Sequence, residues 1–202
     1  MRLLLTGFEP FGGERINPSG EVVRVIEAAP PPGVELTTMI LPVRGRISFE
    51  QLVPALANHD AWLGLGEAGG RAQLSVERVG INVLVDRGPE SPSHEEQTLV
   101  EGAPAAYFSQ LPVGDLAGRI NEAGSPATVS NSAGTYICNE VTYVVQHHLA
   151  TSGRAIPSGF VHLPYLPEQI PGKRPGTPSM ALETQLLGVR AAIDCIRELV
   201  EA

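Results

Sequence analysis

Residues 127–150 read ATVSNSAGTYICNEVTYVVQHHLA. The first three have high strand propensity, and the run stops at a cluster of Ser, Asn and Gly that is typical of a loop. After the loop, apolar residues recur at helical spacing, which predicts a helix from Tyr136 to Ala150. A strand, a loop and a helix in this order indicate an α/β protein, with Cys138 in the first turn of the helix.

Cys138 is a candidate nucleophile because of this position. The attacking form of cysteine is the thiolate, and the partial positive charge at a helix N-terminus favours an anion. Free cysteine is also among the residues most often buried, so a packing role is the alternative. The rest of the chain has to decide between the two roles.

Short apolar runs alternate with helical patterns along the chain. Strands are predicted at 2–6, 34–43, 61–66, 127–129 and 155–163, and helices after an Asn17 cap with Pro18 at its first position and at 48–57, 111–122, 136–150 and 180–200. Continuous apolar strands between helices predict a mainly parallel sheet covered on both faces. No internal repeat or linker divides the chain, so residues 1–202 are expected to form one domain.

Two segments fit this alternation less well. Residues 74–85 predict an extended strand or hairpin arm that could lie at a sheet edge, with the charged Glu77 and Arg78 in its middle. Residues 86–102 are polar with no clear period, and so long a loop in a compact domain is usually a functional lid or a mobile segment.

Composition excludes several classes of protein. The chain has 14 Lys and Arg against 22 Asp and Glu, a formal charge of −8, and no basic run, which argues against a nucleic-acid surface. Its N-terminal apolar run is too short for a signal peptide or a membrane span, so we expect a cytoplasmic protein with Cys138 and Cys195 reduced. The second of these borders the apolar stripe of the last helix and is interpreted as a packing residue.

Familiar cofactor and hydrolase motifs are missing from the sequence. The loop at 7–13 is rich in glycine, but it is neither G-x-G-x-x-G nor followed by G-K-[ST], which makes a nucleotide site a weak hypothesis. No H-E-x-x-H or paired-cysteine motif indicates a metal, and no G-x-S-x-G indicates a serine hydrolase.

A histidine base is available for Cys138. His162 lies near the carboxyl end of a predicted strand, and loops 7–13 and 67–70 follow two other strands. Because sites in open α/β sheets lie outside the carboxyl ends of the strands, these segments and the start of the Cys138 helix are expected to converge on one rim. A cysteine nucleophile and a histidine base close in space are what such a site requires.

A third group should orient the histidine. Glu77 is the preferred candidate, since an unpaired carboxylate inside an apolar strand would be costly. A salt bridge to a nearby arginine, or a solvent-facing edge position, would explain the same residue. The pattern alone leaves Glu77, Glu67 and Asp86 as alternatives.

Five segments together resemble the pyroglutamyl peptidase type I family, and the resemblance covers nearly the whole chain. They are TGFEPFGG at 6–13, NPS at 17–19, ERV and IN at 77–79 and 81–82, SNSAGTYICN at 130–139 and GFVHLPY at 159–165. The resemblance implies an α/β/α sandwich and an enzyme that removes N-terminal pyroglutamate from peptides without a cofactor. It also implies that Cys138, His162 and Glu77 are the catalytic triad.

Further roles follow from the resemblance alone. Phe8 and Phe11 would hold the flat lactam ring, Asn17 would bond its amide, and Arg87 would lie near the oxyanion. Core packing of the two phenylalanines and helix capping by Asn17 remain structural alternatives that are compatible with these roles.

Two departures from the family pattern involve carboxylates. Glu67 stands where many members have Gln beside the substrate, which puts its substrate contact in doubt, and a carboxylate there would raise the pKa of the thiol by like-charge repulsion. Glu140 stands where many members have His, but residues two apart on a helix do not face each other.

These residues are compatible with three functions. A cysteine peptidase specific for N-terminal pyroglutamyl peptides is favoured because all three catalytic side chains are present. The others are a binding protein for cyclic-amide peptide ends that has lost turnover, and a hydrolase acting on another cyclic acyl group. The resemblance also implies a homodimer or homotetramer, with no nucleic-acid or membrane partner.

Overall fold

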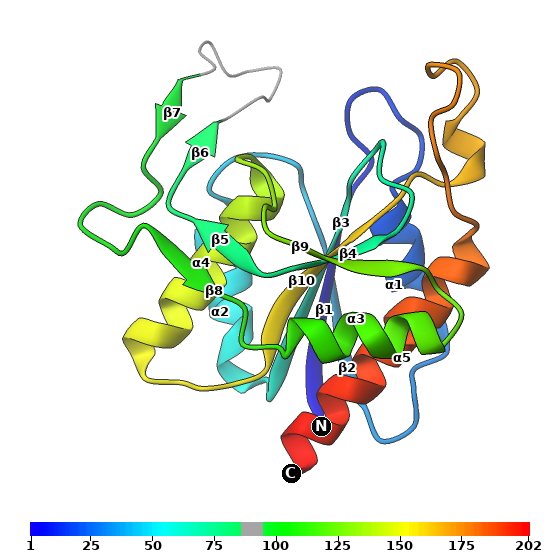
Figure 1. Cartoon of the computed structure of the whole chain (residues 1–202). Helices are drawn as coiled ribbons and strands as arrows, with labels where there is room; N and C mark the ends of the chain where they lie inside the picture. The colour runs from blue at the N-terminus through cyan, green and yellow to red at the C-terminus, as the bar shows by residue number, and fades with distance from the viewer. Residues whose placement is uncertain (86–94) are drawn as a thin grey trace.

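The computed structural model describes residues 1–85 and 95–202 and is built around a central sheet (Figure 1). Six strands form this sheet in the order β2-β1-β3-β10-β4-β9. Their bounds are β1 Arg2–Phe8, β2 Glu35–Leu41, β3 Ala61–Glu67, β4 Leu74–Glu77, β9 Ala127–Ser130 and β10 Ser158–Leu163. The helices are α1 Pro18–Ala28, α2 Val53–Ala55, α3 Val113–Glu122, α4 Ile137–Ser152 and α5 Leu182–Glu201.

Helices cover both faces of the sheet, so the three-layer α/β/α prediction is confirmed. Helices α1, α3 and α5 pack on one face, and α4 with the helical turns around α2 packs on the other (Figure 1). Alternate residues of each strand enter opposite cores, as the two-residue period of a strand requires: Leu63 and Leu65 of β3 face α1 and α5, whereas Trp62 faces α4.

The direction of the strands corrects one expectation. Strands β2, β1, β3 and β10 run parallel, but β4 is antiparallel to β10, and β9 is parallel to β4. The carboxyl ends of β1, β3 and β10 therefore share a rim that β9 does not reach. Residues from all four segments expected on one rim do line a single cavity, but the Cys138 helix reaches it through the segment 131–136 and not directly from the carboxyl end of β9.

The segment 74–85 also differs from its prediction. It divides into β4, β5 Val79–Ile81 and β6 Leu84–Val85, and β4 lies inside the sheet between β10 and β9 rather than at an edge. Burial on both faces explains the apolar residues of β4, all of whose side chains are buried. Other boundaries shift by up to three residues from the predicted ones.

The predicted helix at 48–57 is helical but irregular. It consists of a π turn Ser48–Leu52, the short α2 and a 3-10 turn Leu56–Asn58. Pro54 lies inside this stretch, and proline supplies no N–H to a regular helical ladder.

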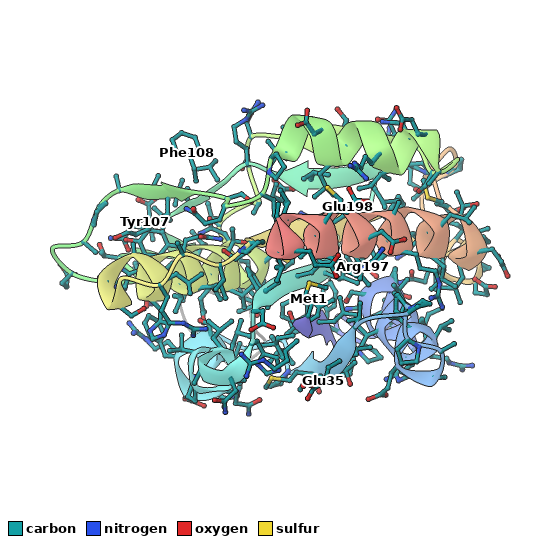
Figure 2. All side chains as sticks on the ribbon, turned by 90° about the horizontal axis from the view of Figure 1, so that it is seen from below. Met1, Glu35, Tyr107, Phe108, Arg197 and Glu198 are labelled. Atoms are coloured by element: carbon teal, nitrogen blue, oxygen red, sulfur yellow. The ribbon has the colours of Figure 1, made fainter. Side chains whose placement is uncertain are left out.

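Two small ribbons lie beyond the sheet. β5 pairs with β8 Ala106–Phe108, and β6 pairs with β7 Glu96–Gln97. In β8, Tyr107 packs toward α4 against Tyr143 at 5.3 Å between ring centroids, whereas Phe108 projects away from the ribbon and is 67% exposed (Figure 2).

The segment predicted as a lid is anchored at its described end. Val100 exchanges two hydrogen bonds with the Asn82 side chain, at 2.8 and 2.9 Å, and Leu99 is buried. Residues 86–94 of the predicted lid lie outside the described residues. None of the helices in ranges 1–85 and 95–202 has the length and apolarity needed to cross a membrane.

Candidate active site

A cavity of about 250 Å³ lies where the ends of β1, β3 and β10 meet the start of α4. It is lined by Phe8, Phe11, Asn17, Val43, Glu67, Ala133, Gly134, Thr135, Tyr136, Ile137, Cys138 and His162. Six of the candidate site residues from the sequence analysis therefore line a single cavity: Phe8, Phe11, Asn17, Glu67, Cys138 and His162. Glu77 lies behind His162, and Arg87 and Asp86 lie outside the described residues.

The antiparallel pairing of β4 with β10 brings Glu77 to His162. Glu77 is opposite Phe160 and Ser75 is opposite His162, so Glu77 and His162 are diagonal neighbours on one face of the sheet. The Glu77 Oε1 and His162 Nδ1 atoms are 2.7 Å apart, and both side chains are buried. Of the two candidate carboxylates that the structure describes, Glu67 and Glu77, it is Glu77 that contacts the imidazole.

Two glycines on β3 make room for the site. Gly66 is beside His162 in the parallel pair, and a Cβ built there would be 2.8 Å from the Cys138 Sγ and 2.7 Å from the Phe160 ring. A Cβ at Gly64 would be 2.5 Å from both the Phe160 and Trp62 rings. Only glycine leaves enough space here for the thiol and the ring below it.

The start of α4 is fixed by a buried asparagine. Asn139 accepts a hydrogen bond from the Ile81 N–H at 2.9 Å and donates to the Ile81 and Val83 carbonyls at 2.9 and 2.7 Å. These bonds hold the first turn of α4 against β5 and so set the position of Cys138. The first N–H groups of a helix have no carbonyl one turn earlier, and here they border the cavity.

The histidine is poised as a neutral base. Burial lowers the pKa of His162, and the opposing hydrogen bond and charge of Glu77 do not restore it. Burial would raise the pKa of Glu77, but the hydrogen bonds that its carboxylate accepts from His162, Ser130 and Arg71 keep that pKa below its usual range. A neutral ring that donates Nδ1–H to an ionised Glu77 leaves Nε2 as a proton acceptor.

The cysteine is not a preformed thiolate. Burial, followed by the charge of Glu77, raises the pKa of the half-buried Cys138 thiol to about 12, while Arg71 opposes the shift and Glu67 adds to it. The helix N-terminus favours the thiolate, but it does not by itself ionise this thiol. The repulsion expected from Glu67 is present, but it ranks behind burial and Glu77. A base must remove the proton during the reaction.

Both phenylalanines line the cavity, and one of them also packs in the core. Phe8 is buried in the core, 6.5 Å from the Phe160 ring between centroids, and also lines the cavity, whereas Phe11 is 40% exposed. Asn17 caps α1 by accepting from Ser19 N–H at 3.0 Å, and its Nδ2 donates to the Glu9 carbonyl at 3.0 Å. Capping uses the side-chain oxygen of Asn17, and the bond to Glu9 uses one of the two Nδ2 hydrogens, so the other Nδ2 hydrogen can still donate.

Glu67 is held by a residue that the sequence analysis did not single out. Gln169 Nε2 donates to the Glu67 Oε2 at 2.7 Å, and Gln169 Oε1 accepts from the Leu166 N–H at 2.9 Å. Burial raises the pKa of Glu67. A buried glutamine in a proline-rich loop is a weak sequence signal, which is why the pair could not be foreseen.

Glu140 points away from the cavity, as its spacing from Cys138 predicts. Its buried carboxylate accepts from the Arg46 N–H at 2.7 Å and from the Ser48 N–H at 3.2 Å. It is thus a structural link between α4 and the segment that precedes α2. Burial raises its pKa.

Residues 1–199 match a family model described as pyroglutamyl peptidase. The chain belongs to the pyroglutamyl peptidase family. It is 40% identical over 204 residues to the pyrrolidone-carboxylate peptidase of Coprothermobacter proteolyticus, covering 99% of each chain. It is 42% identical over 196 residues to that of Yersinia pestis, covering 95% of this chain and 91% of the relative.

Solved structures of the family agree with the fold. A mutant pyrrolidone carboxyl peptidase from Pyrococcus furiosus matches with a TM-score of 0.90 and 39% identity over 98% of this chain and 99% of that chain. Pyroglutamyl peptidase I from Bacillus amyloliquefaciens matches with a TM-score of 0.88 and 33% identity over 96% and 94%. The resemblance read from the five sequence segments is confirmed.

Proposed function

We propose that this member of the pyroglutamyl peptidase family hydrolyses the amide bond that follows an N-terminal pyroglutamyl residue, with Cys138, His162 and Glu77 as its catalytic triad. The observation that carries the proposal is the 2.7 Å contact between Glu77 Oε1 and His162 Nδ1, beside a cavity that also exposes the Cys138 thiol. Nucleophile, base and orienting group are the three parts that acyl transfer through a thiol requires.

In the first half of the reaction, Cys138 Sγ attacks the pyroglutamyl carbonyl carbon and His162 Nε2 takes the thiol proton. A neutral imidazole suits this step because the thiol, with a pKa of about 12, is protonated at neutral pH. Glu77 stabilises the imidazolium that forms. His162 then gives the proton to the leaving amine, the C–N bond breaks, and a thioester remains.

In the second half, water attacks the thioester. His162 takes one proton from the water and returns it to the sulfur as the C–S bond breaks, which releases pyroglutamate. The oxyanion in both halves would be met by the first N–H groups of α4, and each such donor contributes roughly 3 kcal/mol in comparable sites. Assistance from Arg87 rests on the resemblance alone.

The cavity is suited to a cyclic amide. A lactam end carries no ammonium group, so it needs an apolar slot with one or two hydrogen-bonding groups rather than an acidic anchor or a metal. Phe8 and Phe11 would flank the ring, and the free hydrogen on Asn17 Nδ2 would bond its carbonyl. We assign to Glu67, held by Gln169, acceptance of the lactam N–H.

Three further proposals concern the compartment, the substrates and the oligomeric state of the protein. We propose that it acts in the cytoplasm on peptides that begin with pyroglutamate, and that it forms a homodimer or homotetramer. Sedimentation-velocity ultracentrifugation would test the last point, and a single species with the mass of one chain would contradict it.

Hydrolysis of pyroglutamyl-aminomethylcoumarin by the reduced protein tests the proposed function. We expect turnover that is lost in Cys138→Ser, and none with the uncyclised glutamyl substrate. No turnover by folded, reduced protein between pH 5 and 9 would overturn the proposal and favour a binding protein for cyclic-amide peptide ends. Turnover of another cyclic acyl group alone would favour a hydrolase of different specificity.

A further inference from the structure

Arg71 contacts both the carboxylate behind His162 and the loop that leads to Cys138. No motif in the sequence draws attention to this residue. It lies in the turn after β3, where its N–H donates to the Ala68 carbonyl at 3.2 Å. One guanidinium nitrogen, Nη1, donates to Glu77 Oε1 at 2.7 Å, and the other, Nη2, donates to the Ser132 carbonyl at 3.1 Å. Its side chain is 34% exposed, whereas Glu77 is fully buried.

We propose that Arg71 is a positioning residue of this active site, whose guanidinium ties the Glu77 carboxylate to the segment 130–132 that leads into the nucleophile helix. The inference rests on the proposed function for its kinetic part, because the reaction is the one assigned above. Its geometric part rests only on the contacts of Arg71.

One oxygen of the Glu77 carboxylate accepts from two donors. Glu77 Oε1 accepts from both His162 Nδ1 and Arg71 Nη1, each at 2.7 Å. A buried carboxylate is stable as an anion only when it is paired, and a neutral histidine provides no charge to pair with it. Arg71 supplies that charge, so Glu77 can stay ionised while His162 stays neutral.

Arg71 also contacts the loop that leads to Cys138. The Ser132 carbonyl accepts from Arg71 Nη2 and from the Ser130 hydroxyl at 3.2 Å, and the Gly134 N–H donates to the Ser132 hydroxyl at 3.2 Å. The chain then runs through residues 133–137, which line the cavity, to Cys138. Because β9 ends away from the rim, this loop carries the chain to α4, whose first turn is also held by Asn139. The guanidinium of Arg71 therefore holds both this loop and the Glu77 carboxylate.

The charge of Arg71 also acts on Cys138 and His162. The Arg71 charge lowers the pKa of the Cys138 thiol and also lowers that of His162. Both directions assist the proposed first step, since the thiol ionises more readily and the imidazole remains an acceptor at lower pH. Arg71 does not line the cavity, so it should affect the reacting groups rather than substrate binding.

Arg78 provides a matched control. Its Nε donates to the Asn131 side chain at 2.8 Å, in the same loop, but no bond joins it to Glu77 among the described residues. Arg71→Gln removes the charge, Arg71→Lys keeps the charge but not the two-armed geometry, and Arg78→Gln removes a cation from the loop only.

The experiment measures kcat and KM on the pyroglutamyl substrate together with the pH dependence of Cys138 alkylation by iodoacetamide. For Arg71→Gln we expect kcat/KM to fall roughly 10- to 100-fold, as the loss of one charge-assisted hydrogen bond implies. The loss should come from a lower kcat, with KM little changed. Its alkylation at fixed pH should slow, and the acid limb of kcat/KM should move to higher pH. Arg71→Lys should keep the acid limb but lose part of kcat, and Arg78→Gln should resemble the wild type.

A folded Arg71→Gln protein with wild-type kcat, or one whose losses Arg78→Gln reproduces, would overturn the inference. If Arg71→Gln does not fold, Arg71→Lys carries the test, and wild-type kcat with an unchanged alkylation rate would overturn it. If the wild type itself lacks turnover, the proposed function fails, and the alkylation rates of the same variants still decide the role of Arg71.

Discussion

At the scale of single residues, the ionisation of His162 decides when the site can work. In the proposed mechanism its neutral form is the base, and the protonated form cannot accept the thiol proton. Burial lowers the pKa of His162 below its ordinary 6.5, while that of Glu77 stays below 4.5. The imidazole is therefore neutral through the physiological range, with an ionised carboxylate behind it.

The pH profile of the wild type follows from these directions. We expect kcat/KM to fall only as the pH drops through a value below 6.5, where His162 becomes protonated, and to show no alkaline limb from the thiol up to pH 9, because the thiol pKa is about 12. Steady-state kinetics between pH 5 and 9 would check this. An acid limb centred above 6.5 would mean that the pull of Glu77 on the imidazole proton outweighs burial.

The carboxylate of Glu67 should make the thiol less reactive. Glu67→Gln keeps the shape of the side chain and the bond from Gln169, but it removes a charge that raises the pKa of Cys138. We expect alkylation by iodoacetamide at pH 8 to become faster, because the fraction of thiolate rises as the pKa of the thiol falls.

Glu140→Gln is the control for that measurement, since Glu140 is on the same helix but bonds the segment at 46–48 instead. Its alkylation rate should match that of the wild type. Equal acceleration in both variants would show that overall charge, and not the placement of Glu67 in the cavity, governs the thiol.

At the scale of elements, β3 shows how a strand can be shaped by its neighbours' side chains. Gly66→Ala would place a Cβ 2.8 Å from the Cys138 Sγ and 2.7 Å from the Phe160 ring. We expect unfolding to become easier by about 1–3 kcal/mol, the usual cost of overpacking, and kcat/KM to fall with it. Thermal unfolding and kinetics of the same preparation measure both effects, and a variant with wild-type Tm and kcat/KM would contradict the close packing.

A second glycine gives the opposite expectation. Gly118 is exposed within α3, and no atom lies within 4 Å of a Cβ built there. Gly118→Ala should stabilise the protein by about 0.5–1 kcal/mol, because alanine loses less backbone entropy in a helix. For a chain of this size the change corresponds to an increase in Tm of about 1–4 °C. A lower Tm would show that α3 contacts something that the monomer does not contain.

The elements also show what the sequence could and could not predict. Periodicity predicted the strands that carry His162 and Glu67 and the helix that carries Cys138, because each is amphipathic or continuously apolar. It could not predict that β4 runs antiparallel between β10 and β9, since strand direction depends on long-range pairing that no local pattern records. The same pairing brings Glu77 to His162, so from the residues alone the partner of His162 stayed open.

At the scale of the whole molecule, each central strand belongs to both cores. Leu3 and Leu5 of β1 pack on the side of α1 and α5, while Leu4 between them packs on the side of α4. Neither helical layer can leave without exposing the side chains of strands that the other layer also needs. The structure therefore favours one cooperative unit, in line with the single domain expected for residues 1–202.

Two spectroscopic probes would test that unit. Trp62 is the only tryptophan in the chain and is fully buried on the α4 side, so its fluorescence reports that core. Far-UV circular dichroism reports the helices of both faces. We expect the two signals and the loss of peptidase activity to coincide in a urea titration, as two-state unfolding requires. If ellipticity persisted after the fluorescence change, the α1, α3 and α5 layer would be folding on its own, and the chain would contain two units rather than one.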